Sequence, residues 1–426
     1  MIFSFTLLNS NSKSFIYLSF VDNQQQQFFI KTALKIDPSQ WDNEKQRPKN
    51  IYLKSFKKLN VKLDALSISI ATYMNELKTS KREFSLRTVN RLVKKCCTES
   101  ELKLPEGGLL HSTDNFIKSR LHLITPTTHK RYLVFFRLLK RFEGHQQKHL
   151  MIEHVNSTFV KDFISFTEAE NYSISTVHRT IHFVRTVLNF LEKRGVRTFV
   201  YELELPKIRK INHAISLSED EISTIKNTDV PSYLKAAKDW LVFSCYTGQR
   251  VSDFMNFNLD MMEILDGKPC LSFTQQKTHK NILLPLHPTA LIIMSSNGNR
   301  FPNKLNPQKY NEQIKEVTRI AGITDLVKVK KRKGFRSSDQ LIPKCEAITS
   351  HVGRRSFATN FYGKIPTALL MDATGHSTEQ MFQRYISNVD TERTRSLGTY
   401  LENMYQNRSM LREGHLNSLV LRQFQE

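Results

Sequence analysis

The chain has 426 residues, which is too long for one hydrophobic core and, at roughly 100–200 residues per domain, predicts two to four domains. Its 39% hydrophobic and 24% charged residues are typical of a globular protein and exclude a disordered one. The formal net charge of +23 is positive in every third of the sequence. This pattern predicts a long polyanion contacted by every domain, with nucleic acid the first candidate and a membrane surface the weaker one.

The cysteines and the missing motifs limit the chemistry. The five cysteines are odd in number, and of these Cys96 and Cys97 alone are close in sequence, which predicts reduced thiols in a cytoplasmic protein. No CxxC or HExxH pattern predicts a metal site, no GxxxxGK[ST] predicts a nucleotide site, and no apolar run predicts a membrane span. We therefore expect a cytoplasmic protein without metal, cofactor or membrane contact.

The first predicted unit covers residues 1–105. Residues 14–21 and 28–35 alternate apolar and polar side chains, which predicts a hairpin with one buried face, and a further short strand could precede it. Apolar residues at helical spacing from 53 to 77 add a helix. The result is a small, basic sheet-plus-helix domain.

Residues 110–205 are predicted to form a helical bundle. We expect Thr127 and Ser175 to cap two helices, Ser157 to open another, and Gly195 to end the last in the left-handed conformation. Basic residues lie between the apolar positions of several helices, so we expect the bundle to contact DNA. These residues are Lys130, Arg131, Arg137, Lys140, Arg141, Arg179 and Arg185.

A larger domain is predicted over residues 214–407, opened by a capping box of Ser218 and Glu221. We expect helices near 219–227, 231–246, 307–321, 352–362, 366–373, 378–386 and 391–405, with a turn at Gly248 and strands near 270–275 and 281–285. The basic insertion 324–349 is expected to be an exposed loop over a phosphate backbone. Its basic residues include Lys330, Lys331, Arg332 and Lys333. Residues 408–426 form a short tail, expected to be a helix that packs in cis or on a neighbouring subunit.

The stretch 350–386 gathers groups suited to phosphoryl chemistry. His351 and Arg354 lie on one helical face, and His376 precedes Tyr385 by nine residues. Attack on a phosphodiester needs fixed cations for the charge on the phosphate oxygens, and groups that accept and donate protons. Arginine suits the first role because its planar fork stays charged and can bind two oxygens at once.

The order of these motifs resembles a known family. TGQRVSD, a hairpin lysine before ILLPL, HVGRRSFAT, and ATGH followed by FQRYI resemble the tyrosine recombinases, or phage-type integrases. The N-terminal ALKIDPSQWD is similar to arm-site-binding domains of integrases from Bacteroides-type mobile elements, and the resemblance covers residues 14–405. It implies a multidomain, mainly α fold: a sheet-plus-helix arm-binding domain, a helical SAM-like core-binding domain and a mixed α+β catalytic domain.

The resemblance also implies roles for single residues. Arg250 and Arg354 would clamp the scissile phosphate, and Lys277 would protonate the leaving 5′ oxygen. His351 would support acid and base catalysis, and His376 would hold a phosphate oxygen.

Two further residues complete the implied site. Tyr385 would be the nucleophile, forming a 3′-phosphotyrosyl link that conserves the bond energy without metal or ATP. Asp253 would orient His351 or Arg250.

The implied partners are double-stranded DNA at core and arm sites, copies of the same chain forming a tetramer on synapsed DNA, and accessory DNA-bending or excisionase proteins. The function implied is integration or excision of a mobile element. DNA inversion is an alternative, as is an enzyme like the type IB topoisomerases or an end-resolving enzyme. An inactive DNA-binding regulator is disfavoured by the intact set of candidate residues.

Overall fold

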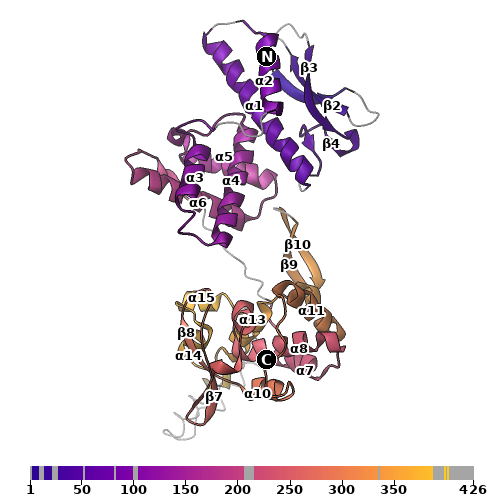
Figure 1. Ribbon diagram of the computed structural model, residues 1–426, viewed down its shortest axis with the longest axis vertical. Coiled ribbons are helices and arrows are strands. Elements are labelled where there is room, and N and C mark those ends of the chain that lie inside the picture. The colour runs from indigo at the N-terminus through magenta and orange to yellow at the C-terminus, as the bar shows by residue number, and fades with distance from the viewer. Residues whose placement is uncertain are drawn as a thin grey trace, which may run out of the picture. The chain divides into compact units, whose positions relative to one another are not determined.

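The structure is a computed structural model that describes residues 2–8, 14–21, 27–50, 53–80, 83–98, 104–205, 215–333, 336–386, 398–399 and 401–402. The chain divides into two compact units (Figure 1). The first contains residues 1–208 and 332–338, and the second contains 209–331 and 339–426.

The first unit begins with an antiparallel sheet. Strands β1 (Ile2–Leu7), β2 (Ser14–Val21) and β3 (Gln27–Ile36) follow one another in space, with Leu18 opposite Ile30. The alternating side chains of β2 put Ile16, Leu18 and Phe20 in a core with helices α1 (Lys54–Ser80) and α2 (Leu86–Thr98). A 3₁₀ turn (Pro38–Gln40) and the short strands β4 (Trp41–Asp42) and β5 (Arg47–Pro48) lie between sheet and helices along the chain. The predicted hairpin and the further strand before it are both present.

Four helices lie in residues 104–205 of this unit. They are α3 (Leu109–Ser119), α4 (Pro126–Gln146), α5 (Ser157–Ala169) and α6 (Ile174–Glu192), with 3₁₀ turns at Ile152–His154 and Val200–Glu202. Their shared core includes Phe142, Phe163 and Val184. Gly195 has the predicted left-handed conformation, with φ +82°.

Two caps in this bundle were predicted at the wrong residue. Thr125, not Thr127, caps α4, because Pro126 takes the first helical position and the Thr125 side chain accepts the amide of Thr128. Ser173, not Ser175, caps α6 by accepting the amide of Thr176. In each case a second hydroxyl residue two positions further on misled the prediction.

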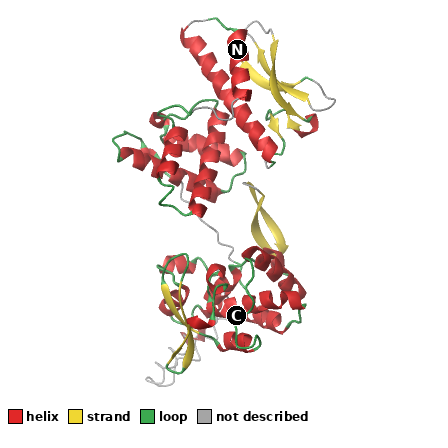
Figure 2. Cartoon of the chain, in the orientation of Figure 1, coloured by secondary structure: helices red, strands yellow, loops and turns green. Residues whose placement is uncertain are grey.

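The second unit is mainly helical with one three-stranded sheet (Figure 2). Its helices are α7 (Glu219–Asn227), α8 (Ser232–Thr247), α9 (Val251–Phe254), α10 (Pro288–Ser295), α11 (Pro307–Ile320), α12 (Lys344–Ala347), α13 (Val352–Phe361), α14 (Thr367–Thr374) and α15 (Glu379–Gln383). The sheet has the order β6 (Met262–Leu265), β7 (Lys268–Thr274), β8 (Asn281–Pro285), after a 3₁₀ turn at Leu259–Met261. Trp240, Leu241 and Phe243 of α8 lie in the middle of the core.

The capping box that opens this unit is present as predicted. Ser218 accepts the amide of Glu221, and the Glu221 carboxylate accepts the amide of Ser218 at 2.7 Å. The helix predicted near 378–386 is shorter, because α15 ends at Gln383 and Tyr385 lies in the turn that follows. The helix expected near 391–405 falls largely, and the tail 408–426 wholly, outside the described residues.

The insertion 324–349 is a hairpin, not the loop we expected. Strand β9 (Leu326–Lys333) pairs with β10 (Arg336–Pro343), and α12 follows. In β9 the half-buried Val327 and Val329 alternate with exposed lysines, which is a strand pattern that the high basic charge obscured. Two backbone bonds close the hairpin at its base, from Lys344 to Asp325 at 2.8 Å and from Cys345 to Ile323 at 3.1 Å.

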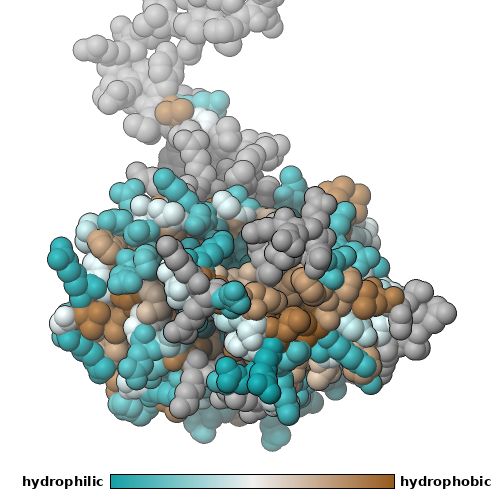
Figure 3. Space-filling view, turned by 90° about the horizontal axis from the view of Figure 1, so that it is seen from above, coloured by the Kyte–Doolittle hydropathy of each residue, from teal (hydrophilic) through white to brown (hydrophobic). Residues whose placement is uncertain are grey.

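No helix within the described part of the chain is long and apolar enough to cross a membrane. Hydrophilic residues cover much of the face drawn in Figure 3, and hydrophobic residues gather in a smaller area of it.

Candidate active site

The turn after α8 places Arg250. Gly248 ends α8 in the left-handed conformation with φ +67°, where its amide bonds to the Ser244 carbonyl. A Cβ at this position would lie 2.6 Å from Cδ1 of Phe357, so both backbone angle and space call for glycine. The chain then reverses, and Arg250 becomes the N-terminal residue before α9, with a side chain 12% exposed.

Helix α13 places Arg354 beside that turn. A Cβ on Gly353 would lie 1.9 Å from Oγ of Ser244, so this glycine lets α13 lie directly against α8. Arg354 is fully buried, and its Nη1 and Nη2 donate to the carbonyls of Gly248 (3.0 Å) and Thr374 (2.6 Å). Burial, and then the charge of Arg250, lower the pKa of Arg354 to about 10, which still leaves it protonated at neutral pH.

His376 follows the left-handed Gly375 that ends α14, and it is buried. Its Nε2 lies 3.1 Å from Nη2 of Arg354, and its Nδ1 lies 2.7 Å from the Thr374 hydroxyl. Burial and the charges of Arg354, Arg250 and Lys280 lower the pKa of His376 to about 3, so the ring is neutral at pH 7. The Thr374 hydroxyl donates to the Leu370 carbonyl, so Nδ1 carries the proton and Nε2 accepts from Arg354.

Tyr385 faces this pair from the turn after α15. Its half-buried ring lies 4.9 Å from the His376 ring, centre to centre, and 5.5 Å from the guanidinium carbon of Arg354. The Tyr385 carbonyl accepts the hydroxyl of Thr359 at 3.3 Å, which fixes the turn to α13. The candidate nucleophile therefore stands next to two of the candidate phosphate-binding groups.

Lys277 and His351 lie at the edge of the cluster. Lys277 is exposed in the turn between β7 and β8, and His351 directly precedes α13. Burial lowers the pKa of His351, as do the charges of nearby cations. These are Arg355, Arg354, Lys277 and Arg250. His351 thus lies within electrostatic reach of both arginines and of the hairpin lysine.

Asp253 is buried beside Arg250. Its Oδ1 accepts the amide of Gln276 at 3.0 Å, and its Oδ2 lies 3.9 Å from Nη1 of Arg250 without a hydrogen-bond partner among the described residues. Of the two targets expected for this carboxylate, Arg250 is the one it approaches.

The sequence reasoning missed two residues of this site. Lys280, half-buried in the same turn as Lys277, lies close enough to His376 to lower its pKa. Gln275, fully buried, bonds directly to Arg250. A second lysine three residues after the first was visible in the sequence, whereas a glutamine before a turn carries no signal of burial.

The basic residues that were expected to contact DNA and whose side chains the structure describes fall into two groups. Most are exposed on α4, α6 and β9: Lys130, Arg131, Arg137, Arg179, Lys330 and Lys331. Lys140, Arg141 and Arg185 are half-buried, and Arg141 is held within the bundle by Glu170 at 3.2 Å and by the hydroxyl of Tyr172. The side chains of Arg332 and Lys333 lie outside the description.

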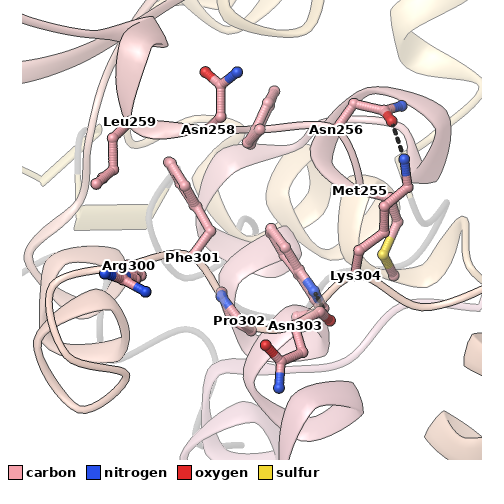
Figure 4. Close-up of a pocket in the computed structure, with 11 residues that line it drawn as sticks. Met255, Asn256, Asn258, Leu259, Arg300, Phe301, Pro302, Asn303 and Lys304 are labelled. Atoms are coloured by element: carbon pink, nitrogen blue, oxygen red, sulfur yellow. Dashed lines mark hydrogen bonds between the residues drawn. The ribbon is translucent and has the colours of Figure 1, made fainter.

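A cavity of about 400 Å³ lies elsewhere in this unit, and none of the candidate catalytic residues lines it (Figure 4). Phe257, Phe301 and Pro302 form part of its wall, and Lys304 bonds there to Asn256 at 2.5 Å. Within the described residues, no group of three or more His, Cys, Asp or Glu side chains is placed to hold a metal ion.

Two solved structures that this chain resembles are of the Tn1549 transposon integrase. One, in complex with a circular intermediate DNA, is 12% identical, covers 69% of this chain and 100% of its own, and has a TM-score of 0.50. Another, in complex with transposon right end DNA, is 11% identical, covers 69% and 99%, and has a TM-score of 0.50. These likenesses show a shared fold. No curated protein gives a significant match.

Family models match three consecutive parts of the chain. They describe an arm DNA-binding domain over residues 6–90, a phage integrase SAM-like domain over 109–196 and the phage integrase family over 216–392. Their order confirms the predicted fold class. The chain belongs to the phage integrase family of tyrosine recombinases, the site-specific enzymes that cut and rejoin DNA strands.

Proposed function

We propose that Tyr385 cleaves DNA by forming a 3′-phosphotyrosyl intermediate, and that the enzyme integrates or excises a mobile element by this reaction. The observation that supports it most is the position of the Tyr385 ring, which lies 5.5 Å from the guanidinium carbon of the buried Arg354 and 4.9 Å from the ring of the neutral His376. Arg250 in turn lies close enough to Arg354 to lower its pKa. The match to an arm DNA-binding domain favours an integrase over a topoisomerase-like enzyme.

In the proposed step the phenol oxygen of Tyr385 attacks phosphorus, the bond between phosphorus and the 5′ oxygen breaks, and the bond energy is kept in the new ester. The phenol proton passes to His351, whose lowered pKa makes it a neutral acceptor at pH 7. Lys277, exposed in the β7–β8 turn, supplies a proton to the leaving 5′ oxygen. Rejoining runs the same steps in reverse.

The two arginines contribute differently in this proposal. Arg354 is wholly buried, and both its terminal nitrogens already bond to protein groups, so it stabilises the phosphate mainly through its charge. Arg250 keeps part of its side chain exposed and is the better placed to touch phosphate oxygens. His376 accepts from Arg354 in this arrangement, so its first role is to orient that arginine.

The partners we propose follow from charge and domain order. Double-stranded DNA binds at core sites through the helical bundle and the catalytic domain, and at arm sites through the N-terminal domain. We propose that the arm-binding domain covers residues 1–105, the helical bundle 110–205 and the catalytic domain 214–407. The tail 408–426 packs on a neighbouring subunit. A tetramer on synapsed DNA, accessory DNA-bending or excisionase proteins and a place in the bacterial nucleoid complete the proposal.

Substitution of the nucleophile tests the reaction. Tyr385→Phe should leave the affinity for element-end DNA within about twofold but abolish the covalent adduct on a nicked suicide substrate. Tyr362→Phe is the matched control, since Tyr362 is also half-buried and contacts the same short helix through Phe382. An adduct formed by Tyr385→Phe, or lost in Tyr362→Phe, would contradict the assignment.

A further inference from the structure

Gln275 occupies an unusual position for a glutamine. It stands where β7 gives way to the turn that carries Lys277, and its side chain is fully buried. Neutral amides are seldom buried completely unless their hydrogen-bonding groups are satisfied.

All four hydrogen-bonding positions of this amide are used. Oε1 accepts from Nη1 of Arg250 at 2.7 Å and from the Thr278 hydroxyl at 2.6 Å. Nε2 donates to the Thr374 carbonyl at 3.0 Å and to Oε1 of Gln249 at 3.3 Å. Because a guanidinium can only donate and a carbonyl can only accept, the amide has one orientation that satisfies its partners.

The surrounding backbone is shaped to this side chain. A Cβ added to Gly375 would lie 2.6 Å from Oε1 of Gln275, so the glycine before His376 leaves room for the amide. Gln249 extends the network by donating to the carbonyls of Thr247 and Ala373. The amide therefore joins three segments that are distant in sequence: the turn after α8, the β7–β8 turn and the end of α14.

We propose that Gln275 is a positioning residue for strand cleavage: it fixes the guanidinium of Arg250 relative to the turn of Lys277 and to the segment of His376. The inference rests on the proposed function. A flexible arginine loses less conformational freedom in the transition state when it is already held in place.

The neutrality of the amide matters as much as its geometry. A carboxylate at this position would pair with Arg250 and weaken the field that Arg250 exerts on a phosphate, and Asp253 already lies 3.9 Å away. Glutamine holds the arginine without neutralising it.

The first test is Gln275→Met, which keeps the length of the side chain but removes its hydrogen bonds. We expect single-turnover adduct formation on a suicide substrate to slow about 10- to 100-fold, with DNA affinity within about threefold. Gln313→Met is the matched control: Gln313 of α11 is also buried, but its amide donates to the carbonyl of Tyr233 and not to a group of the site. The control variant should form the adduct at a rate per folded molecule within about threefold of that of the parent enzyme.

A second variant adds a signature that loss of packing would not produce. Gln275→Glu should be slow at pH 8, where the carboxylate pairs with Arg250. Its rate relative to the parent should rise as the pH falls, because a protonated carboxyl can accept from Arg250 and donate to the Thr374 carbonyl as the amide does. A ratio independent of pH would count against the positioning role.

The combination with Arg250→Lys tests whether Gln275 acts through Arg250. In that background Gln275→Met should slow adduct formation by less than about threefold, and a full additional loss would overturn the coupling. A normal adduct rate in Gln275→Met alone would overturn this inference and leave the proposed function standing. Absence of any adduct with the parent enzyme would overturn the proposed function and this inference together.

Discussion

His376 is held neutral by its surroundings. Its Nε2 accepts from Arg354, and its Nδ1 donates to Thr374, whose hydroxyl donates onward to the carbonyl of Leu370. Protonation would place a further cation beside Arg354 and Arg250 and would break the bond to Arg354. The contacts that orient Arg354 therefore also oppose protonation of His376.

This penalty predicts a pH-dependent stability. The pKa of His376 is about 3 in the folded chain and about 6.5 for an unperturbed histidine. The contribution of His376 to the free energy of unfolding is complete above pH 6.5 and is lost progressively as the pH falls toward 3. The reason is that the histidine of the unfolded chain is protonated at a higher pH than the histidine of the folded chain. We expect a loss of about 2–3 kcal/mol by pH 4.5 from this residue, and His351 adds to it with the same sign.

Urea unfolding followed by Trp240 fluorescence would measure this loss for the second unit. Trp41, the other tryptophan, is replaced by phenylalanine so that it does not contribute. His376→Asn should flatten the decline between pH 6.5 and 4.5, whereas His122→Asn, at an exposed position in the first unit, should leave it unchanged. An unchanged decline in His376→Asn would show that another group is responsible.

Part of the candidate site could be predicted from the sequence. The ordered motifs around Arg250, Arg354, His376 and Tyr385 indicated one site, and the structure brings these residues together. Gln275 could not be predicted, because its burial depends on Thr374, which lies 99 residues further along the chain. A local pattern carries no information about such a contact.

At the scale of elements, the crossing of α8 and α13 positions the site. Gly353 lies against Ser244, and three residues later in α13 the Ser356 hydroxyl accepts the amide of Leu217. Since Arg354 follows Gly353 directly, the closeness of the two helices sets how deeply the guanidinium enters the site.

Gly353→Ala should force the two helices apart. Its Cβ would lie 1.9 Å from Oγ and 2.6 Å from Cβ of Ser244, and overpacking of this kind costs about 1–3 kcal/mol. Chemical unfolding should show the loss, and the adduct rate should fall with it because Arg354 is displaced. Ser244→Gly should partly restore both in the double variant. Gly398→Ala, where a Cβ meets no atom within 4 Å, should change neither.

Helices and strands were predicted correctly where the signal lay in the local sequence. The prediction was wrong where contacts with distant residues determine the structure. The alternation in β2 and the capping box of Ser218 and Glu221 were sufficient to predict their elements. Helical spacing also continued past Gln383, but the chain turns there, and the Tyr385 carbonyl bonds to Thr359 of α13. The hairpin β9–β10 was missed because its charge, not its alternation, was taken as the signal.

At the scale of the whole molecule, the hydrophobic cores separate along the chain. The core of the N-terminal sheet takes its residues from between Phe5 and Cys97, and the core that includes Phe142 from between Leu109 and Leu203. The largest core of the second unit begins at Leu217. A deletion that removes the residues of one core therefore takes no residue from the other two cores.

Deletion of residues 1–105 should weaken binding to arm-site DNA while covalent adduct formation on a core-site suicide substrate stays within about threefold. The reason is that all the candidate catalytic residues and the core around Trp240 remain. Gel shifts on each DNA and the adduct assay would separate the two effects. Loss of adduct formation by a folded truncated chain would contradict the proposed domain limits.

The base of the β9–β10 hairpin has a consequence for how this enzyme could diversify. The bonds from Lys344 to Asp325 and from Cys345 to Ile323 close the frame at the point where the hairpin leaves the domain. Any turn that preserves these two bonds would close the same frame, so the length and charge of the hairpin can vary without moving His351 or Arg354. Such an arrangement lets the hairpin diverge while the residues of the candidate site keep their places.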